Sequence, residues 1–391
     1  MSQVPITPQD LDYRKELARI LIPEGRTEVD LMMQPNLSVL PVDQALTADL
    51  GLQFPQDLAP IPQELPNPPD PNAPLPAADV LVVTWTVDEQ MGMCDVLTPG
   101  FNRNAWYRYR HLFDQNFRSQ IRAGAPSLQA NRLGSWFPIM IGNKKVICMK
   151  SELHLNQDGI SDPNNPGHAT LPVKDFFKQM IAETGASHVL TVGTAGATFP
   201  DHDLGDVVVT RGAKFRLQSE FGQESFRNDV YQSNWDVPLM HFQTATDLMA
   251  GFASRLKEPK SVAPTVRYEI GKVPTNDPSI VLDGRDMPAF HPILTTDFFE
   301  FGTSANGLQN IGCAVEMGDA ALGLACQEIG AGAPKWLIVR NLSDPQINAD
   351  LPGGPRETNL QSAWAVYYYR TYGYWTSVNS ALATWAIIAG L

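Results

Sequence analysis

Cysteine is scarce in this sequence, with 4 residues among 391. The cysteines lie far apart and form neither a CxxC pair nor the spacing of a zinc site, which excludes a disulfide framework and a cysteine-based metal centre. We interpret them as buried thiols of a protein from a reducing compartment, and we expect no metal cofactor. The four residues are Cys94, Cys148, Cys313 and Cys326.

Basic residues are also few. Lys and Arg total 29 against 42 Asp and Glu, which gives a formal net charge of −13. A chain with this balance has no global positive field to hold a nucleic-acid backbone or an anionic membrane surface. We therefore expect no nucleic-acid partner and no membrane partner, while a local anion pocket remains compatible with the composition.

Long apolar runs are missing as well. The sequence has no stretch of about 18 apolar residues, the length needed to cross a membrane. Its first residues, MSQVPITPQD, lack the basic and apolar segments of a secretory signal. Residues 363–391 are aromatic and apolar, but Arg370 and Asn379 interrupt them, so we predict a terminal helix packed on a sheet. With 43% hydrophobic residues the composition is that of a globular protein, for which we expect a cytoplasmic location.

Proline is distributed unevenly along the chain. Of 32 prolines, 14 lie at or before Pro76, and nine of these lie between Pro55 and Pro76. This density is incompatible with a helix or a central strand and predicts an extended, polyproline-like arm. We assign residues 1–77 to a proline-rich N-terminal extension with one short helix near residues 10–22. Scattered apolar residues favour docking of this extension over a disordered tail; they are Leu31, Met32, Leu40, Leu46 and Phe54.

From residue 78 onwards, predicted strands alternate with predicted helices. Continuous apolar runs at 78–86 and 145–150 are typical of strands buried on both faces. Residues 171–184 have the apolar periodicity of an amphipathic helix, and Gly185 stands where such a helix would end. A strand then leads into a glycine-rich turn at 193–197. Further along, we predict a strand at 206–210, a helix that opens with residues 314–317 and a strand at 336–339.

This alternation predicts an α/β fold in which a mixed, mostly parallel central sheet is flanked by helices, in one domain over residues 78–391. Ligands bind such sheets at the carboxyl ends of the strands, which here means residues 86–89, 193–196 and 341–344. The GTAGA segment at 193–197 is no dinucleotide fingerprint, because Ala195 stands where a glycine is required. Its backbone N–H groups and the Thr194 hydroxyl can hold an anion or a sugar oxygen, or the segment is a structural tight turn.

Four motifs occur in the order and spacing of a known family: VLTVGTAGA at 189–197, LGDVVVT at 204–210, AVEM at 314–317 and IVRNLSD at 338–344. In this respect the sequence resembles the nucleoside phosphorylase and nucleosidase superfamily, and is similar to the methylthioadenosine/adenosylhomocysteine nucleosidases and the hexameric purine nucleoside phosphorylases. The resemblance implies a phosphorylase/hydrolase-like fold and cleavage of the N-glycosidic bond of a purine nucleoside or nucleoside derivative. It also implies a small-molecule nucleoside substrate, no organic cofactor and a homo-oligomer.

The resemblance gives catalytic roles to Asp344 and Glu89. Asp344 matches the acid that protonates the purine as the bond breaks, which requires burial to raise its pKa above the usual value of about 3.9. Taken alone, Asp344 also fits a helix cap or a turn before Pro345. Glu89 matches the carboxylate that activates water at the anomeric carbon and stabilises an oxocarbenium-like sugar. Asp88 is its nearest competitor, and a solvated loop acid is the other interpretation.

Substrate contacts are predicted in two ways. Thr194 and Gly196 are expected to contact the ligand because their segment lies at a strand end, whereas two other contacts follow from the resemblance. Phe299 matches an aromatic ring that stacks on the base, and Met317 matches a methionine that packs against the ribose. Both of these residues are equally compatible with an ordinary apolar core.

The residue after Met317 departs from the family pattern. A glutamate there binds the ribose hydroxyls in the family, whereas this sequence has Gly318. Either Glu316 or Asp319 takes over that task, or the sugar is held differently. His154 falls near the expected site, but a lone histidine is more often a structural group, and we leave it outside the catalytic set.

The nucleophile is predicted from a second departure. Phosphorylases of the family have a phosphate-binding arginine two residues before Gly193, and this sequence has Thr191 there. This difference favours water, and therefore hydrolysis, over phosphorolysis with phosphate as co-substrate. An arginine at position 103, 108 or 110, or one from a neighbouring subunit, could restore a phosphate site. A catalytically silent nucleoside-binding protein on the same fold is the remaining alternative.

Overall fold

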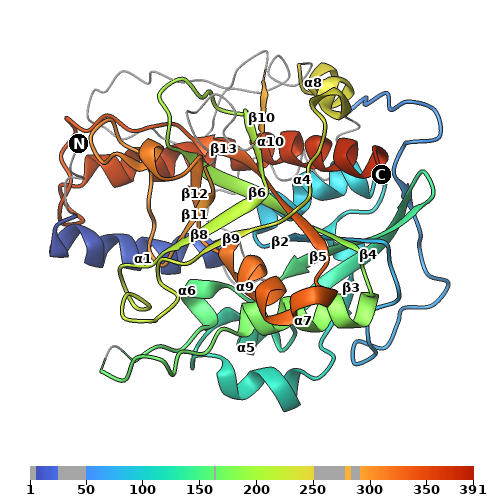
Figure 1. Ribbon diagram of the computed structural model, residues 1–391, viewed down its shortest axis with the longest axis horizontal. Coiled ribbons are helices and arrows are strands. Elements are labelled where there is room, and N and C mark those ends of the chain that lie inside the picture. Colours follow the sequence, from blue (N-terminus) through green and yellow to red (C-terminus); the bar gives the residue numbers. More distant parts are fainter. Residues whose placement is uncertain (1–5, 25–49, 163, 251–277, 283–290) are drawn as a thin grey trace.

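The apolar runs of the sequence lie at the centre of one mixed sheet in the computed structural model of the chain (Figure 1). The structure describes residues 6–24, 50–162, 164–250, 278–282 and 291–391. Helices cover both faces of the sheet, as the sequence predicts for an α/β protein. The apolar residues of the N-terminal extension between positions 31 and 46 lie outside the described residues.

Four parallel strands form the middle of the sheet. They are β5 (Lys144–Ser151), β2 (Val80–Thr84), β6 (His188–Ala197) and β13 (Lys335–Asp344), and each pairs with the next in parallel register. Every residue of β2 is buried, because helices cover both of its faces. These strands confirm the predictions made from the apolar runs, and their carboxyl ends share one edge of the sheet.

Shorter strands extend the sheet on both sides. The order across it is β1-β4-β5-β2-β6-β12-β11-β8-β9, with β3 beside β4, and with β7 between β13 and β10. Strand β12 runs antiparallel to the last residues of β6. The bounds are β1 (Ile61–Pro62), β3 (Tyr107–Tyr109), β4 (Gly134–Ile141), β7 (Val207–Thr210), β8 (Gly212–Arg216), β9 (Val230–Gln232), β10 (Ile280–Leu282), β11 (Ile293–Thr296) and β12 (Ala314–Glu316).

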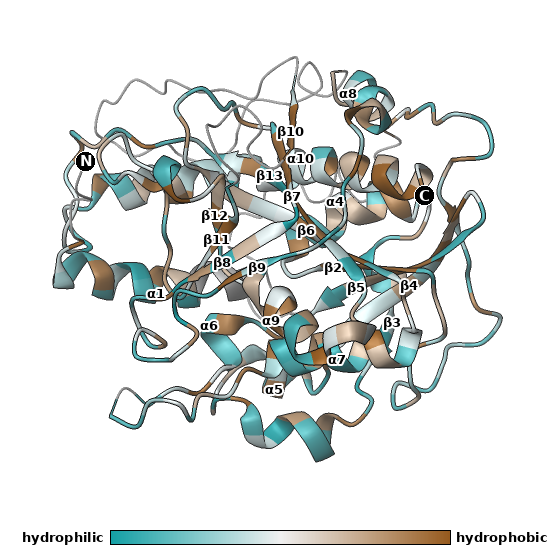
Figure 2. Ribbon diagram, in the orientation of Figure 1, coloured by the Kyte–Doolittle hydropathy of each residue, from teal (hydrophilic) through white to brown (hydrophobic). Residues whose placement is uncertain are grey.

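Helices bury the two faces of the sheet in separate apolar cores. On one face, α7 (Pro172–Thr184) and α9 (Ala320–Ile329) pack against each other and against alternate residues of β2. On the other face, α4 (Val87–Leu97) and α10 (Leu360–Ala389) pack against the remaining residues of β2. This division follows from the strand repeat, since successive side chains point to opposite faces. Figure 2 shows hydrophobic residues on the central strands and towards the C-terminal end of α10.

Two of these helices match the sequence predictions closely. Helix α7 is followed by Gly185 in the left-handed conformation, with φ at 61°. Helix α10 is the predicted terminal helix; within the described residues, no helix is long and apolar enough to cross a membrane. The four cysteines are buried thiols outside any disulfide, also as predicted. The shorter α-helices are α5 (Pro126–Ala130), α6 (Leu155–Asp158) and α8 (Gln243–Met249).

The described part of the N-terminal extension packs along the domain. Helix α1 (Pro8–Glu24) confirms the short helix predicted near residues 10–22. The proline-rich segment contains no helix, as predicted, but it is not extended throughout, because turns lie at residues 56–58 and 71–72. Between them it forms β1 at the edge of the sheet, where a strand tolerates proline. Further on, the Leu75 N–H donates a hydrogen bond of 2.7 Å to the Glu183 carboxylate of α7.

Two predicted local structures are wrong. Residues 193–197 do not form a turn, because β6 continues through Ala197 and pairs with β13 on one side and β12 on the other. The glycines there give space to side chains of adjacent elements, as glycine in a strand often does. Residues 314–317 do not open a helix, because residues 314–316 form β12 and α9 begins at Ala320.

Candidate active site

A cavity lies at the carboxyl ends of β2, β6 and β13, where the sequence analysis places the ligand. It contains about 640 Å³ of empty space with its open mouth included. The walls are formed by Trp85, Thr86, Glu89, His154, Thr194, Ala195, Gly196, Phe299, Glu300, Val315, Glu316, Met317, Gly318, Arg340, Ser343, Asp344 and Tyr369.

The structure brings all but one of the predicted site residues onto this wall. They are Glu89, Thr194, Gly196, Phe299, Glu316, Met317 and Asp344. The exception is Asp319, which is fully buried behind the wall, where its carboxylate binds Arg340. His154 lines the cavity, although the sequence analysis left it outside the catalytic set.

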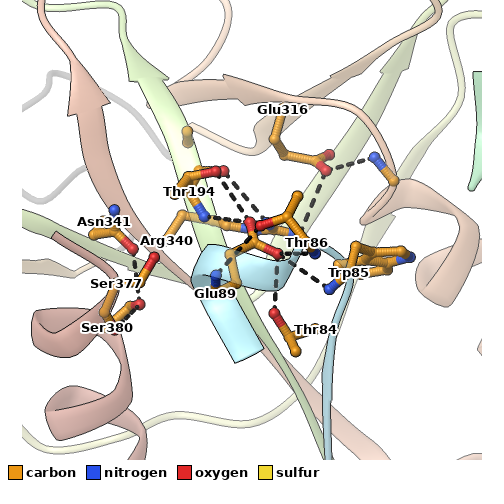
Figure 3. Close-up of polar contacts among 12 residues, drawn as sticks. Thr84, Trp85, Thr86, Glu89, Thr194, Glu316, Arg340, Asn341, Ser377 and Ser380 are labelled. Atoms are coloured by element: carbon orange, nitrogen blue, oxygen red, sulfur yellow. Dashed lines mark hydrogen bonds and ion pairs between the residues drawn. The ribbon is translucent and has the colours of Figure 1, made fainter. Parts of the chain in front are cut away.

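Glu89 is held at the start of α4 by a capping box with Thr86. The Glu89 N–H donates to the Thr86 hydroxyl at 3.3 Å, and the Thr86 N–H donates to Glu89 Oε2 at 2.9 Å. Oε2 also accepts from the Thr84 hydroxyl at 2.9 Å and from the Trp85 N–H at 3.1 Å (Figure 3). The sequence TWTVDE thus fixes this carboxylate at the positive end of the helix dipole, which favours its ionised form.

The other carboxylate oxygen of Glu89, Oε1, faces β6. It accepts hydrogen bonds from the N–H and the hydroxyl of Thr194, at 2.8 and 3.0 Å. Arg340 Nη1 lies 3.5 Å away, longer than the roughly 2.8 Å of a strong charge-assisted bond. Burial by itself would raise the pKa of Glu89, but Arg340 and the backbone donors outweigh it and lower that pKa. Glu89 is therefore an ionised group on the cavity wall.

Arg340 is a central site residue that the sequence analysis missed. It lies in β13, is buried, and donates two hydrogen bonds of 2.8 and 2.6 Å to Asp319. Its guanidinium also lies 3.6 Å from Glu316 Oε2 and 4.9 Å from the centre of the Trp85 ring. A signal was available in the sequence, because an arginine inside an apolar strand is seldom buried without a charged partner.

Glu316 ends β12 beside Arg340. Its carboxyl group accepts hydrogen bonds from the backbone N–H groups of Gly318 and Asp319 and from the Thr295 hydroxyl. Burial raises the pKa of Glu316, the Asp319 charge raises it further, and Arg340 offsets only part of this effect. The site therefore favours the protonated form of Glu316 more than a solvated glutamate would.

Asp344 is the last residue of β13. Its Oδ1 accepts a hydrogen bond of 3.1 Å from the Ser343 hydroxyl, while its buried Oδ2 has no hydrogen-bond partner. The absence of a side chain at Gly196 makes room for this oxygen, because a Cβ there would lie 2.7 Å from Oδ2. Burial raises the pKa of Asp344 to about 7. A carboxyl group in this state can exchange a proton with a ligand at neutral pH.

Aromatic side chains form much of the remaining wall. Phe299 was predicted there, whereas Trp85 and Tyr369 were not. Trp85 lies beside Gly318, where a Cβ would be 3.4 Å from the indole ring, and its buried Nε1 has no hydrogen-bond partner. Together with Met317, these rings suit a flat, apolar ligand group.

Positive charge on the wall is limited. Among the residues that the structure describes, Arg340 is the only cationic side chain lining the cavity. Thr191 is fully buried within β6 and does not reach it. Burial and the neighbouring Lys150 lower the pKa of His154 to about 3, so this ring is neutral. Over the same described ranges, no group of three or more His, Cys, Asp or Glu side chains is placed to hold a metal ion.

Comparisons with known proteins give matches among solved structures. No family model matches the chain, and no curated protein matches it. A 5′-methylthioadenosine/S-adenosylhomocysteine nucleosidase from Neisseria meningitidis, in complex with methylthio-immucillin-A, has 15% identity and a TM-score of 0.42 over 80% of this chain and 100% of that one. An S-adenosylhomocysteine nucleosidase from Streptococcus pyogenes has 13% identity and a TM-score of 0.45, over 81% of this chain and 98% of that one. Futalosine hydrolase from Helicobacter pylori has 13% identity and a TM-score of 0.41, over 80% of this chain and 97% of that one. These structures belong to the superfamily that the sequence motifs resemble.

Proposed function

We propose that the protein hydrolyses the N-glycosidic bond of a purine nucleoside or nucleoside derivative. The observation that carries this proposal is the state of Asp344, a carboxyl group on a cavity wall with one unpaired oxygen and a pKa raised by burial to about 7. A purine anion is a poor leaving group, so the reaction needs a proton donor at the base. A positioned acid of matched pKa contributes roughly 10²–10⁴ in rate.

The base is proposed to lie between Asp344 and the aromatic wall that contains Phe299. Asp344 Oδ2 then donates its proton to N7 while the electron pair of the C1′–N9 bond moves into the base. The base leaves as a neutral molecule, and Asp344 is left as a carboxylate. Burial of Asp344 supports this step, because it disfavours the charged form and makes the proton easier to supply at neutral pH.

Glu89 is proposed to act on the sugar side of the same bond. Its fixed negative charge stabilises the positive charge that develops at C1′. A water that attacks C1′ loses a proton to Glu89 Oε1, either directly or through the Thr194 hydroxyl, which already donates to that oxygen. One proton leaves the water as one enters the base, and transfer of a proton from Glu89 to Asp344 through solvent restores the starting state.

The charges on the wall favour water over phosphate as the nucleophile. Arg340 is paired with Asp319 and lies beside Glu89 and Glu316, so its positive charge is already compensated. A phosphate dianion entering this cavity would meet ionised Glu89 without an uncommitted cation to neutralise it. The arginines at positions 103, 108 and 110 are not part of the wall.

The test is product analysis with the full-length protein in phosphate-free buffer. Adenosine, inosine and methylthioadenosine serve as substrates, and the base and the sugar are both identified. We expect free base and free sugar in equal amounts, with no increase in rate when phosphate is added.

Other outcomes point to the two alternative functions. A strict requirement for phosphate, with sugar 1-phosphate as product, would favour a phosphorylase. Saturable nucleoside binding without release of base would favour a catalytically silent binding protein, for which Gly318 and the commitment of Asp319 to Arg340 would be the structural reasons.

A further inference from the structure

We propose that helix α1 is a structural part of the substrate cavity and that Arg14 is the residue through which it positions the aromatic wall. This inference takes the identity of the ligand from the proposed function, but its structural part stands independently. Among residues 8–19 of the helix, whose side chains the structure describes, none lines the cavity. It contacts the segment that carries Phe299, the start of α10, the helix that carries Tyr369, and α6, which follows His154.

The first contact is with the segment that carries Phe299. The Phe299 N–H donates a hydrogen bond of 3.1 Å to the backbone carbonyl of Arg14. The guanidinium of Arg14 lies 4.1 Å from the centre of the Phe301 ring, a buried cation–π contact. Phe299 and Phe301 pack against each other with ring centres 5.8 Å apart. The backbone carbonyl of Arg14 thus fixes the main chain at Phe299, and its guanidinium fixes the ring that supports Phe299.

The second contact is with the start of α10, which carries Tyr369. Arg14 Nε donates to Asp10 Oδ1 at 2.9 Å, and the same oxygen accepts from Asn359 Nδ2 at 2.6 Å. Asn359 is the N-cap of α10, and its side-chain oxygen accepts from the Ser362 N–H at 2.9 Å. This buried chain of polar groups ties α1 to the first turn of the helix that supplies Tyr369.

The third contact is with α6, which begins directly after His154. Gln157 Nε2 donates to the backbone carbonyl of Arg19 at 3.3 Å. Between these polar contacts, Leu17 and Ala18 belong to one apolar cluster with Phe299 and Phe301. Helix α1 therefore holds the elements of Phe299, Tyr369 and His154 in one arrangement.

The consequence is specific to ligand binding. Among the described residues, no hydrogen bond or ion pair joins α1 to Asp344 or Glu89. Proton transfer should therefore survive a change at Arg14, whereas placement of the base should not. We expect Arg14→Ala to raise KM by about tenfold or more, in line with the cost of small misplacements, and to leave kcat within about threefold. Arg14→Lys keeps a cation over Phe301 and should recover part of the loss.

The experiment compares Arg14→Ala, Arg14→Lys and Glu16→Ala in the full-length protein. Glu16 lies on the same helix but is exposed, and neither it nor Arg356, its exposed ion-pair partner, lines the cavity. Amide hydrogen exchange of residues 297–301 is measured without substrate, together with KM and kcat for the best nucleoside. Alanine keeps the backbone carbonyl that accepts from Phe299, so the variant tests the guanidinium contacts with Phe301 and Asp10. We expect their loss to loosen α1 on the domain, with faster exchange at Phe299 and a higher KM in Arg14→Ala, smaller effects in Arg14→Lys, and none in Glu16→Ala.

Two results would overturn the inference. One is unchanged amide exchange at residues 297–301 in Arg14→Ala. The other is faster exchange in Arg14→Ala that leaves KM unchanged, or that is accompanied by an equal rise in KM in Glu16→Ala. If the wild-type protein releases no base, the proposed function fails. Exchange at Phe299 and nucleoside affinity from calorimetry then decide the role of Arg14, and a protein that binds no nucleoside would refute that role as well.

Discussion

The carboxylate of Glu89 occupies space that any side chain at Gly193 would need. A Cβ at position 193 would overlap both Glu89 Oε1 and the guanidinium of Arg340. The neighbouring residue, Thr194, donates two hydrogen bonds to the same oxygen. The absence of a side chain at one position of β6 therefore allows a carboxylate and a guanidinium to approach the strand closely.

Gly193→Ala is expected to lower kcat/KM at least tenfold, because Glu89 and Arg340 must both move and small misplacements of reacting groups are costly. Gly332→Ala is the matched control, since the nearest atom to a Cβ there is 3.9 Å away. Steady-state kinetics and circular dichroism of the two variants provide the measurement. A Gly193→Ala protein with activity within twofold of wild type would contradict the role assigned to this close approach.

Asp344→Asn is expected to lower turnover by at least about 10²-fold, as the loss of a positioned acid should. Asparagine keeps the size of the side chain, so the fold should persist and nucleoside affinity should change little. Asp350→Asn, at an exposed position off the cavity wall, is the control. Turnover of Asp344→Asn close to that of wild type would show that another group protonates the base.

The pH dependence of kcat/KM follows from the same residue. Burial raises the pKa of Asp344 to about 7, and the proposed reaction needs the protonated form. Activity should therefore be retained below this value and should fall as the pH rises through it, approaching tenfold per pH unit. The residual activity of Asp344→Asn should lack this decline. A wild-type rate that instead rises between pH 6 and 9 would be incompatible with an acid at this position.

Arg340→Met should lower the free energy of unfolding by about 3–5 kcal/mol, because it leaves the fully buried Asp319 carboxylate without its partner. Arg356→Met removes an ion pair that is exposed, and such pairs contribute at most about 1 kcal/mol. Urea unfolding of both variants tests the difference. The double variant Arg340→Met/Asp319→Asn should be more stable than Arg340→Met alone, and a further loss instead would argue against this explanation.

The fold could be predicted wherever local pattern and tertiary environment agree. Strand β2 and helix α7 carry strong apolar patterns, and both lie where the sequence places them. The segment at 193–197 has glycines typical of a turn, but pairing with β13 and β12 extends the strand through it. That pairing depends on residues more than a hundred positions away, which local propensity does not report.

The site residues at the carboxyl ends of the strands could be predicted from the sequence, because ligands bind parallel sheets there. Glu89, Thr194 and Asp344 follow from this rule and from the motifs around them. Trp85 was missed because it continues an apolar run, and Tyr369 because it belongs to a long aromatic helix whose core and cavity faces look alike in sequence. Neither residue differs in type from its neighbours, so only the packing of the elements distinguishes them.

Helix α1 is synthesised before the residues it packs against, so it can dock on the domain only late. Asp10 and its partner Asn359 are 349 positions apart, and Arg14 meets Phe299 across nearly as great a distance in sequence. At about 5–20 residues per second, a ribosome needs roughly 15–70 s to synthesise the intervening chain. During that interval the nascent chain carries the apolar side of α1, with Leu17 and Ala18, without the cluster that buries it. The contacts that complete the cavity are therefore among those of highest contact order, which places its assembly at the end of folding.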